Sequence, residues 1–377
     1  MPRSDIFHLT WARQGGLLSS LAIMVSFLVS ACASAPLSPY SEDSPPLVLV
    51  PVSQAGVVDK RGRFREIFCG VLEARGSTQP GYRACDEALV QLGSEPDGTG
   101  KQVELGESNR QLVGVIVPGV GWDCFSTRLD PKDTSGKHFH QFGYDLTFLK
   151  VDALSSSEKN ARQIHDAIIE MASVGTGPDL VLIGYSKGVS DILEAVVAYP
   201  QIRKRVVAVI SVAGTVGGSP LANDVTQSQL ELLKHWPGSN CSIGDGGAIE
   251  SLRPAKRKTW LANHPLPHDF PYYSLVTYPK PERISSGLKS RYIKLSQVDA
   301  RNDGQVLFYD QVIPESTLLG YVNADHWALV VPIAHSHSML SSIFDDQNQY
   351  PREALLEALL RIVEEDLFTS EKGSKHR

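Results

Sequence analysis

Residues 180–198 read LVLIGYSKGVSDILEAVVA. The aliphatic run Leu180–Ile183 predicts a strand buried on both faces, and Ser190–Ala198 has the apolar spacing of an amphipathic helix. Between them, Gly184-Tyr185-Ser186-Lys187-Gly188 follows the pattern G-x-S-x-G. A sharp turn from strand to helix would hold Ser186 where the helix presents free amides and the positive end of its dipole. A phosphate-binding turn is disfavoured because neither G-x-G-x-x-G nor G-x-x-x-x-G-K-[ST] occurs here.

Apolar runs on both sides of this stretch predict strands that alternate with helices. The other predicted strands are Leu112–Val117, Leu146–Val151, Val206–Val212, Tyr292–Leu295 and Leu318–Val322. Helices are predicted over Ser157–Ala172 and from just after Pro351, which is a good helix start. The alternation predicts an α/β fold built on a mostly parallel, doubly wound sheet.

Two regions depart from this alternation. Residues 47–110 are predicted to form a small helical N-terminal extension, with apolar residues at helical spacing over Phe64–Leu72 and again over Cys85–Leu92. Residues from about 214 to 290 are rich in Gly, Pro, Ser and His, and such a length without a strong strand exceeds an ordinary loop. We expect a lid or cap insertion here; a surface excursion is the alternative.

With its serine turn in this setting, the chain resembles the α/β-hydrolase family over residues 111–370. The resemblance implies that fold, and a triad in the chain order Ser, acid, His. Ser186 is then the nucleophile. His326, in N-A-D-H-W directly after the last predicted strand, is the implied base. Asp303, in N-D-G-Q-V after the predicted strand Tyr292–Leu295, is the implied acid, with Asp310 as the alternative and Asp299 less favoured.

The resemblance also implies an oxyanion hole. The family often has H-G after the strand that corresponds to Leu112–Val117, whereas this chain has Pro118-Gly119-Val120-Gly121-Trp122. The glycines still permit a tight turn, so the amide of Val120 is expected to pair with that of Lys187. The Lys187 side chain is expected to be solvated; attraction of an anionic substrate group is the alternative.

The implied activity is that of a serine hydrolase, similar to lipases and esterases, which cleaves carboxylic esters through an acyl-enzyme intermediate without a cofactor. A non-catalytic envelope protein that binds a partner on the same scaffold, and an acyltransferase, are the alternatives. The histidine pairs His138/His140 and His335/His337 have no convincing third ligand, so no metal site is predicted. The net charge of -6 over 377 residues predicts no nucleic-acid partner.

The first 31 residues predict export. Arg3 and Arg13 precede the apolar run Gly16–Ala31, which is shorter than the roughly 20 residues of a membrane-spanning helix. The following Cys32 completes V-S-A-C, which resembles the bacterial lipobox. That resemblance implies a signal peptide over 1–31, a lipid on Cys32 and a flexible tether over 32–46. The protein is then expected to be anchored in the cell envelope, facing the periplasm, with Ala33 favouring the outer membrane; an uncleaved anchor or a nearby cleavage site is the alternative.

The remaining cysteines fit an oxidising compartment. They are Cys69, Cys85, Cys124 and Cys241, an even number that allows two disulfides. Cys69 and Cys85 lie on adjoining predicted helices, so we expect them to pair, which leaves Cys124 for Cys241. Burial of Cys69 and Cys85 in the core as free thiols is the alternative.

Overall fold

The computed structural model of the chain describes residues 56–76, 81–93, 95–108, 110–122, 139–152, 154–172, 179–225, 244–330 and 349–375. Several predictions fall outside the described residues: the signal peptide with Cys32 and the tether, Cys124 and Cys241, the histidines His138, His335 and His337, and residues 226–243 of the expected lid.

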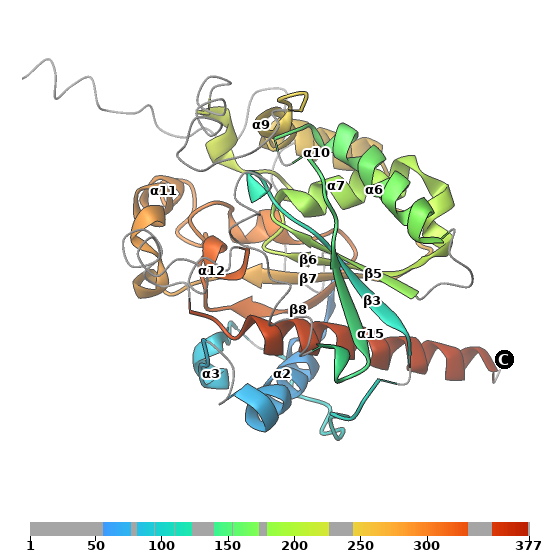
Figure 1. Cartoon of the computed structure of the whole chain (residues 1–377). Helices are drawn as coiled ribbons and strands as arrows, with labels where there is room; N and C mark the ends of the chain where they lie inside the picture. The colour runs from blue at the N-terminus through green and yellow to red at the C-terminus, as the bar shows by residue number, and fades with distance from the viewer. Residues whose placement is uncertain are drawn as a thin grey trace, which may run out of the picture. The chain divides into compact units, whose positions relative to one another are not determined.

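A mostly parallel sheet forms the centre of the described part (Figure 1). Its strands follow the order β1-β8-β7-β6-β5-β3-β4, and every neighbouring pair on this path is parallel. The strands are β1 (Val58–Asp59), β3 (Leu112–Val117), β4 (Tyr144–Phe148), β5 (Asp179–Tyr185), β6 (Val206–Val212), β7 (Tyr272–Thr277) and β8 (Thr317–Val322). The short β2 (Leu89–Val90) pairs with β8 in the antiparallel sense. Because β4 and β5 lie on opposite sides of β3, the strand order reverses between β3 and β5, which is where open α/β sheets place their sites.

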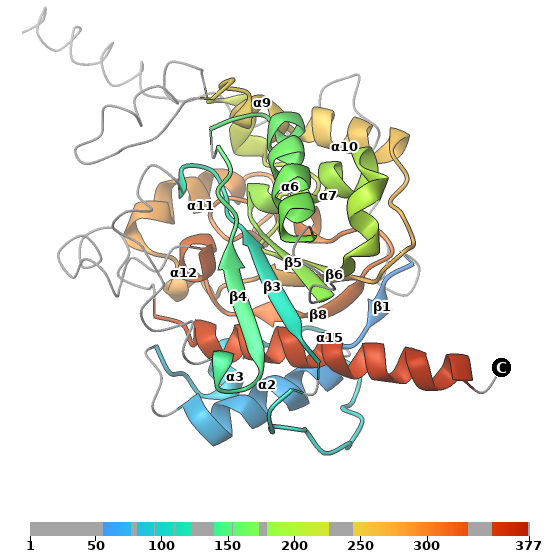
Figure 2. The same ribbon diagram turned by 45° about the vertical axis from the view of Figure 1, so that its right-hand side comes forward.

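Helices cover both faces of this sheet (Figures 1 and 2). On one face lie α6 (Ser157–Ala172) and α7 (Lys187–Ala198), and on the other α2 (Arg61–Arg75) and α15 (Arg352–Lys375). Successive residues of β5 alternate between the two layers: Leu182 packs in the hydrophobic cluster of α6 and α7, whereas Ile183 packs in that of α2 and α15. A strand buried on both faces is therefore continuously apolar, as its sequence indicates.

Short helices fill the connections at the sheet edges. They are α3 (Cys85–Ala88), α9 (Ala248–Ser251), α10 (Pro254–Asn263), α11 (Lys289–Leu295), α12 (His326–Val330) and the 3₁₀ turns η5 (Pro200–Lys204), η6 (Pro220–Asn223), η8 (Pro281–Arg283), η9 (Ser286–Leu288) and η10 (Phe308–Gln311). Among the described residues, no helix is both long and apolar enough to cross a membrane.

The predicted α/β-hydrolase-type sheet is confirmed, with two corrections. Tyr292–Leu295 is not a strand but the end of α11, where only Leu295 is buried. The expected insertion over about 214–290 contains β7, a fully buried strand between β6 and β8, so the lid prediction is wrong for Tyr272–Thr277. Tyr, Ser and Thr dilute the apolar signal of β7 in a region rich in breakers, although all six residues are buried. The lid itself stays a prediction.

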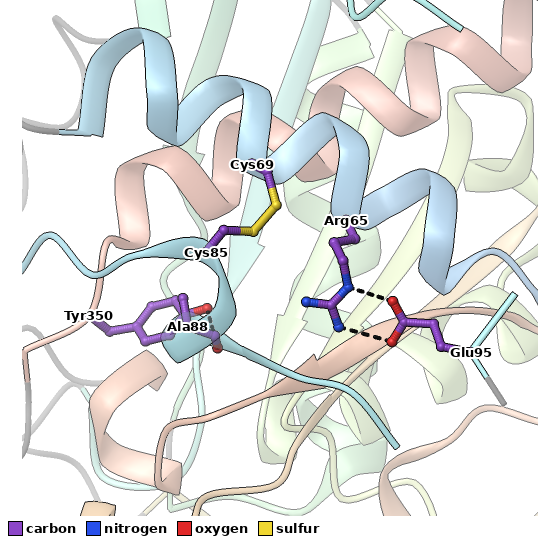
Figure 3. Close-up of a disulfide and its surroundings, with 6 residues drawn as sticks. All are labelled: Arg65, Cys69, Cys85, Ala88, Glu95 and Tyr350. Carbon is purple, nitrogen blue, oxygen red and sulfur yellow. Dashed lines mark hydrogen bonds and ion pairs between the residues drawn. A yellow bond between two sulfur atoms is a disulfide. The ribbon is translucent and has the colours of Figure 1, made fainter. Parts of the chain in front are cut away.

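The N-terminal region is built into the same sheet and core. Helix α2 packs on α15, and β1 and β2 both pair with β8. The predicted disulfide Cys69–Cys85 is confirmed, with Cα atoms 5.4 Å apart, and it joins α2 to α3 (Figure 3). The second predicted helix is a single turn that leads directly into β2.

Candidate active site

The serine turn has the strained geometry expected of it. β5 ends at Tyr185 and α7 begins at Lys187, while Ser186 between them has φ 54° and ψ -122°. A left-handed backbone at a serine is sparsely populated and costs on the order of 1–3 kcal/mol. Two glycines make the turn possible: a Cβ on Gly184 would lie 2.6 Å from the Val189 backbone, and one on Gly188 would lie 2.0 Å from the Val117 carbonyl oxygen. Ser186 is thus held at the carboxyl edge of the sheet, beside the reversal in strand order.

Three predicted site residues meet at this edge. Ser186 Oγ lies 2.9 Å from His326 Nε2, and His326 Nδ1 lies 2.8 Å from Asp303 Oδ2. An ionised carboxylate only accepts hydrogen bonds, so Nδ1–H donates to Asp303 and Nε2 is left to accept the Ser186 hydroxyl. His326 is the first residue of α12 and is buried. The arrangement can therefore remove a proton from Ser186.

Asp303 is completely buried and its carboxylate is densely hydrogen-bonded. Oδ1 accepts the backbone amides of Gln305 (2.9 Å) and Val306 (2.7 Å). Its backbone oxygen also accepts the amide of His326 at 3.1 Å. Buried carboxylates need such partners to offset desolvation, and here the partners also fix the direction of the carboxylate toward the imidazole.

Two residues that the sequence did not single out complete this environment. The Thr277 hydroxyl hydrogen-bonds Asp303 Oδ2, and Gln311 Nε2 lies 3.4 Å from the same oxygen. Gln311 Oε1 accepts the backbone amide of Thr277 at 2.8 Å, which joins the end of β7 to η10. Thr277 could only have been found from the strand that carries it, and that strand was missed.

The turn that carries Val120 and the start of α7 at Lys187 both lie next to the serine. Val120 lies in a turn in which the Trp122 amide points to the Gly119 carbonyl at 3.5 Å and Gly121 has φ 77°. A Cβ on Gly119 would lie 2.8 Å from the Ser186 Cβ, so only glycine lets this turn approach the serine so closely. Lys187 is the first residue of α7, and its amide belongs to the helix end that has no intrahelical acceptor.

The Lys187 side chain is not solvated, which corrects the expectation from sequence. It is 1% exposed, and its Nζ pairs with Asp191 Oδ1 at 2.6 Å one turn along α7. Asn160 Nδ2 on α6 donates to the other Asp191 oxygen at 2.8 Å. Asp191 therefore ties the serine helix to α6, and Lys187, its partner within α7, is buried.

The other candidate acids have different partners. Asp310 lies 3.4 Å from Lys258, and burial raises its pKa to about 6. Asp299 pairs with Arg301 at 2.6 Å, and that hydrogen-bonded guanidinium lowers its pKa. Asp325 accepts the amides of Ala328 (2.9 Å) and Ser285 (2.7 Å), and burial raises its pKa. Asp303 is thus the acid that contacts the imidazole.

Other features of the described residues lie apart from this constellation. His140 is exposed, with Nδ1 3.3 Å from Asp145 Oδ1. Within the described ranges, no three His, Cys, Asp or Glu side chains gather as metal ligands would. An open pocket of about 340 Å³, lined by residues that include Phe270, Tyr272 and Glu315, lies at the amino end of β7, opposite the end that carries Thr277.

Comparisons with known proteins show which superfamily the chain belongs to. No family model matches the chain, and neither does any curated protein. Among solved structures, the metagenomic carboxyl esterase MGS0156 is 40% identical, with a TM-score of 0.81, over 88% of this chain and 100% of that one. The mature lipase BlEst2 of Bacillus licheniformis is 19% identical (TM-score 0.48; 64% of this chain, 95% of that one). A lipase-esterase related protein from Clostridium acetobutylicum is 15% identical (TM-score 0.36; 64% and 98%). The identity to MGS0156 across nearly the whole of both chains shows that this chain belongs to the α/β-hydrolase superfamily, with that carboxyl esterase.

Proposed function

We propose that this protein is a serine hydrolase that cleaves carboxylic esters through an acyl-enzyme intermediate. The observation that carries the proposal is the continuous hydrogen-bond chain from Ser186 Oγ through His326 to Asp303, with its two distances of 2.9 and 2.8 Å. A buried chain of this kind turns a weak hydroxyl into a nucleophile because the proton has a ready acceptor. The similarity to a carboxyl esterase supports an ester as the substrate.

In the first half of the reaction, Ser186 Oγ attacks the ester carbonyl as its proton passes to His326 Nε2. The imidazolium that forms is stabilised by Asp303, which keeps Nδ1–H and does not itself become protonated. The amides of Val120 and Lys187 hold the developing oxyanion. His326 then gives the proton to the leaving alcohol, and the acyl group stays on Ser186.

In the second half, water takes the place of the alcohol. His326 Nε2 accepts a proton from the water as it attacks the acyl carbonyl, and the same proton returns to Ser186 Oγ when the acid leaves. The backbone strain at Ser186 keeps Oγ at the sheet edge in both halves, so the nucleophile does not have to be ordered anew for each turnover.

We propose further that this enzyme lies in the cell envelope. The charged start, the apolar run Gly16–Ala31 and Cys32 support cleavage before Cys32 and lipid attachment there, with the tether between anchor and catalytic domain. The confirmed Cys69–Cys85 disulfide fits an oxidising compartment.

The test combines turnover with covalent labelling. Purified wild type is expected to hydrolyse p-nitrophenyl esters and to gain one fluorophosphonate adduct on Ser186, mapped by peptide mass. Ser186→Ala should lose both. Ser190→Ala is the matched control, because Ser190 lies one turn further along α7 and its hydroxyl donates to the Thr215 carbonyl. Wild-type turnover by Ser186→Ala would refute the mechanism.

A further inference from the structure

A connector of three residues, Asn323–Asp325, joins the end of β8 to His326. At its far end, Asp325 caps α12 by accepting the Ala328 amide at 2.9 Å. At its near end, Asn323 is 2% exposed and begins the connector where β8 stops. The position of the imidazole therefore depends on how these few residues are held.

Every polar group of Asn323 has a partner. Its backbone amide donates to the backbone carbonyl oxygen of Ala88 (2.8 Å), and its side-chain Nδ2 donates to the backbone carbonyl oxygen of Glu87 (2.9 Å). Its backbone oxygen accepts Arg83 Nη1 (2.8 Å), and its side-chain Oδ1 accepts the Lys280 amide (2.9 Å). Three of these four contacts go to one segment, residues 83–88, which lies about 240 residues earlier in the chain.

The segment 83–88 has little regular structure with which to hold itself. It contains only the single turn of α3 and is followed by the two-residue β2, and elements this short are not stable alone. The Cys69–Cys85 disulfide fixes the middle of the segment to α2, a helix of 15 residues that is packed in the core (Figure 3). The disulfide thus supplies the rigidity that the segment lacks.

We infer that Asn323 is a positioning residue for His326, and that the Cys69–Cys85 disulfide sets the position of Asn323 through residues 83–88. The inference rests on the proposed function. Ser186 Oγ and Asp303 Oδ2 must both stay within hydrogen-bond reach of one imidazole, and a misplacement of about 1 Å by a distant change can cost on the order of 100-fold in rate. Loss of the Asn323 contacts or of the disulfide therefore shifts the imidazole away from Ser186 Oγ and Asp303 Oδ2.

The first experiment replaces the asparagine. Asn323→Asp keeps the size and the acceptor for Lys280, but sets a carboxylate oxygen against the Glu87 carbonyl. Asn323→Ser removes the same donor without adding a charge, and serves if the first variant does not fold. Either should lower kcat on a p-nitrophenyl ester about 10- to 100-fold, with KM within about twofold of wild type, and should slow fluorophosphonate labelling of Ser186 in proportion.

The matched control is Tyr350→Phe. The Tyr350 hydroxyl donates to the same Ala88 carbonyl at 3.1 Å (Figure 3), yet within the described part of the chain no hydrogen bond joins it to residues 323–326. This variant should lose stability in thermal unfolding and keep the wild-type kcat. A purely structural role of Asn323 would give the same result as the control, which would overturn the inference.

The second experiment removes the disulfide with Cys69→Ser/Cys85→Ser. Its control is Arg65→Gln, which breaks the ion pair from α2 to Glu95 (Nη2–Oε2 2.9 Å) beyond β2 (Figure 3). Both should unfold at lower temperature, but only the cysteine variant should lose kcat, about 10-fold or more, at unchanged KM. Wild-type kcat without the disulfide overturns the inference. A wild-type enzyme that is neither active nor labelled at Ser186 refutes the proposed function instead.

Discussion

At the scale of single residues, the surroundings of a carboxyl group decide its role more than its distance along the sequence. Asp299, Asp303 and Asp310 lie within one short stretch. Asp303 is aimed at His326 by two backbone amides and by Thr277, whereas Asp299 is bound by its neighbour Arg301. Asp310 is buried against Lys258, and burial keeps its proton on to a higher pH.

Substitution of the acids should separate these roles. Asp303→Asn is expected to lower kcat by about 10⁴-fold, because an amide no longer stabilises the imidazolium or favours the tautomer that has Nδ1–H. Asp310→Asn should stay within a few-fold of wild type, since it has no contact with His326 in the structure. Steady-state kinetics on a p-nitrophenyl ester measures both. A severe loss at Asp310 with a mild one at Asp303 would show that the acid is Asp310.

Asp310 should also make stability depend on pH. Burial raises its pKa from 3.8 to about 6, so between these values the folded protein holds a proton that the unfolded chain has released. The free energy of unfolding therefore falls as the pH rises through this range, by up to about 3 kcal/mol at 1.36 kcal/mol per pH unit.

The measurement is urea unfolding of wild type and Asp310→Asn at pH 4, 5, 6 and 7. In the difference between the two free energies of unfolding, the contributions of the other titrating groups cancel. Wild type should lose stability relative to the variant as the pH rises. Asp299→Asn is the control: the pKa of Asp299 is lowered from 3.8, so its contribution to stability is lost only at more acid pH and should be nearly constant from pH 5 to 7. A difference for Asp310 that is flat with pH would contradict the prediction.

At the scale of elements, the sequence predicted best where burial is symmetrical. The continuously apolar strands β3, β5, β6 and β8 were found to within two residues at each end, because both faces of each are covered. In contrast, β7 (YYSLVT) contains the polar residues Ser274 and Thr277. The Ser274 hydroxyl hydrogen-bonds that of Ser316, and the Thr277 hydroxyl hydrogen-bonds Asp303. The sequence predicts a strand over Tyr292–Leu295 because the periodicity of so short an apolar run is compatible with a strand as well as a helix.

The site was predicted better than the elements that carry it. The triad order predicts Asp303 after the penultimate strand; that strand is β7, and α11 lies between it and Asp303 where the sequence predicts a strand. The predicted order Ser, acid, His still holds, because it depends on the order in which the strands follow one another and not on the exact ends of each strand. Thr277, Gln311 and Asn323 were missed because their roles come from contacts across the sheet edge, which no local pattern records.

The buried pair on α7 allows a prediction about this helix. Asp191→Leu should lower the free energy of unfolding by about 3–5 kcal/mol, because the Lys187 ammonium is left buried without its carboxylate. Adding Lys187→Met should recover most of that loss, since well-packed apolar side chains can replace a buried ion pair. Urea unfolding of the three proteins measures this. A double variant no more stable than Asp191→Leu would show that Lys187 is not the source of the cost.

At the scale of the whole chain, the N-terminal region and the catalytic edge depend on each other. Residues 56–93 contribute β1, β2 and α2 to the same sheet and core as the hydrolase elements, so they are not a separate appendage. Their contacts with Asn323 reach the connector that carries His326. The most N-terminal of the described segments thereby takes part in holding the catalytic edge.

The proposed lipid anchoring at Cys32 can be tested on the mature protein. Cleavage before Cys32 with lipid attachment should give a mature protein whose N-terminal peptide begins at Cys32 and carries an added acyl mass, because lipobox-type processing needs the cysteine thiol. Such a protein should enter the detergent-rich phase in detergent partition, since each buried methylene adds about 0.8 kcal/mol of membrane affinity. Cys32→Ser should lose the acyl mass, whereas Cys241→Ser should keep it. An N-terminus at any other residue, or an unmodified Cys32 in protein from the envelope, would contradict lipid anchoring and leave the hydrolase proposal standing, because that proposal rests on the contacts among Ser186, His326 and Asp303.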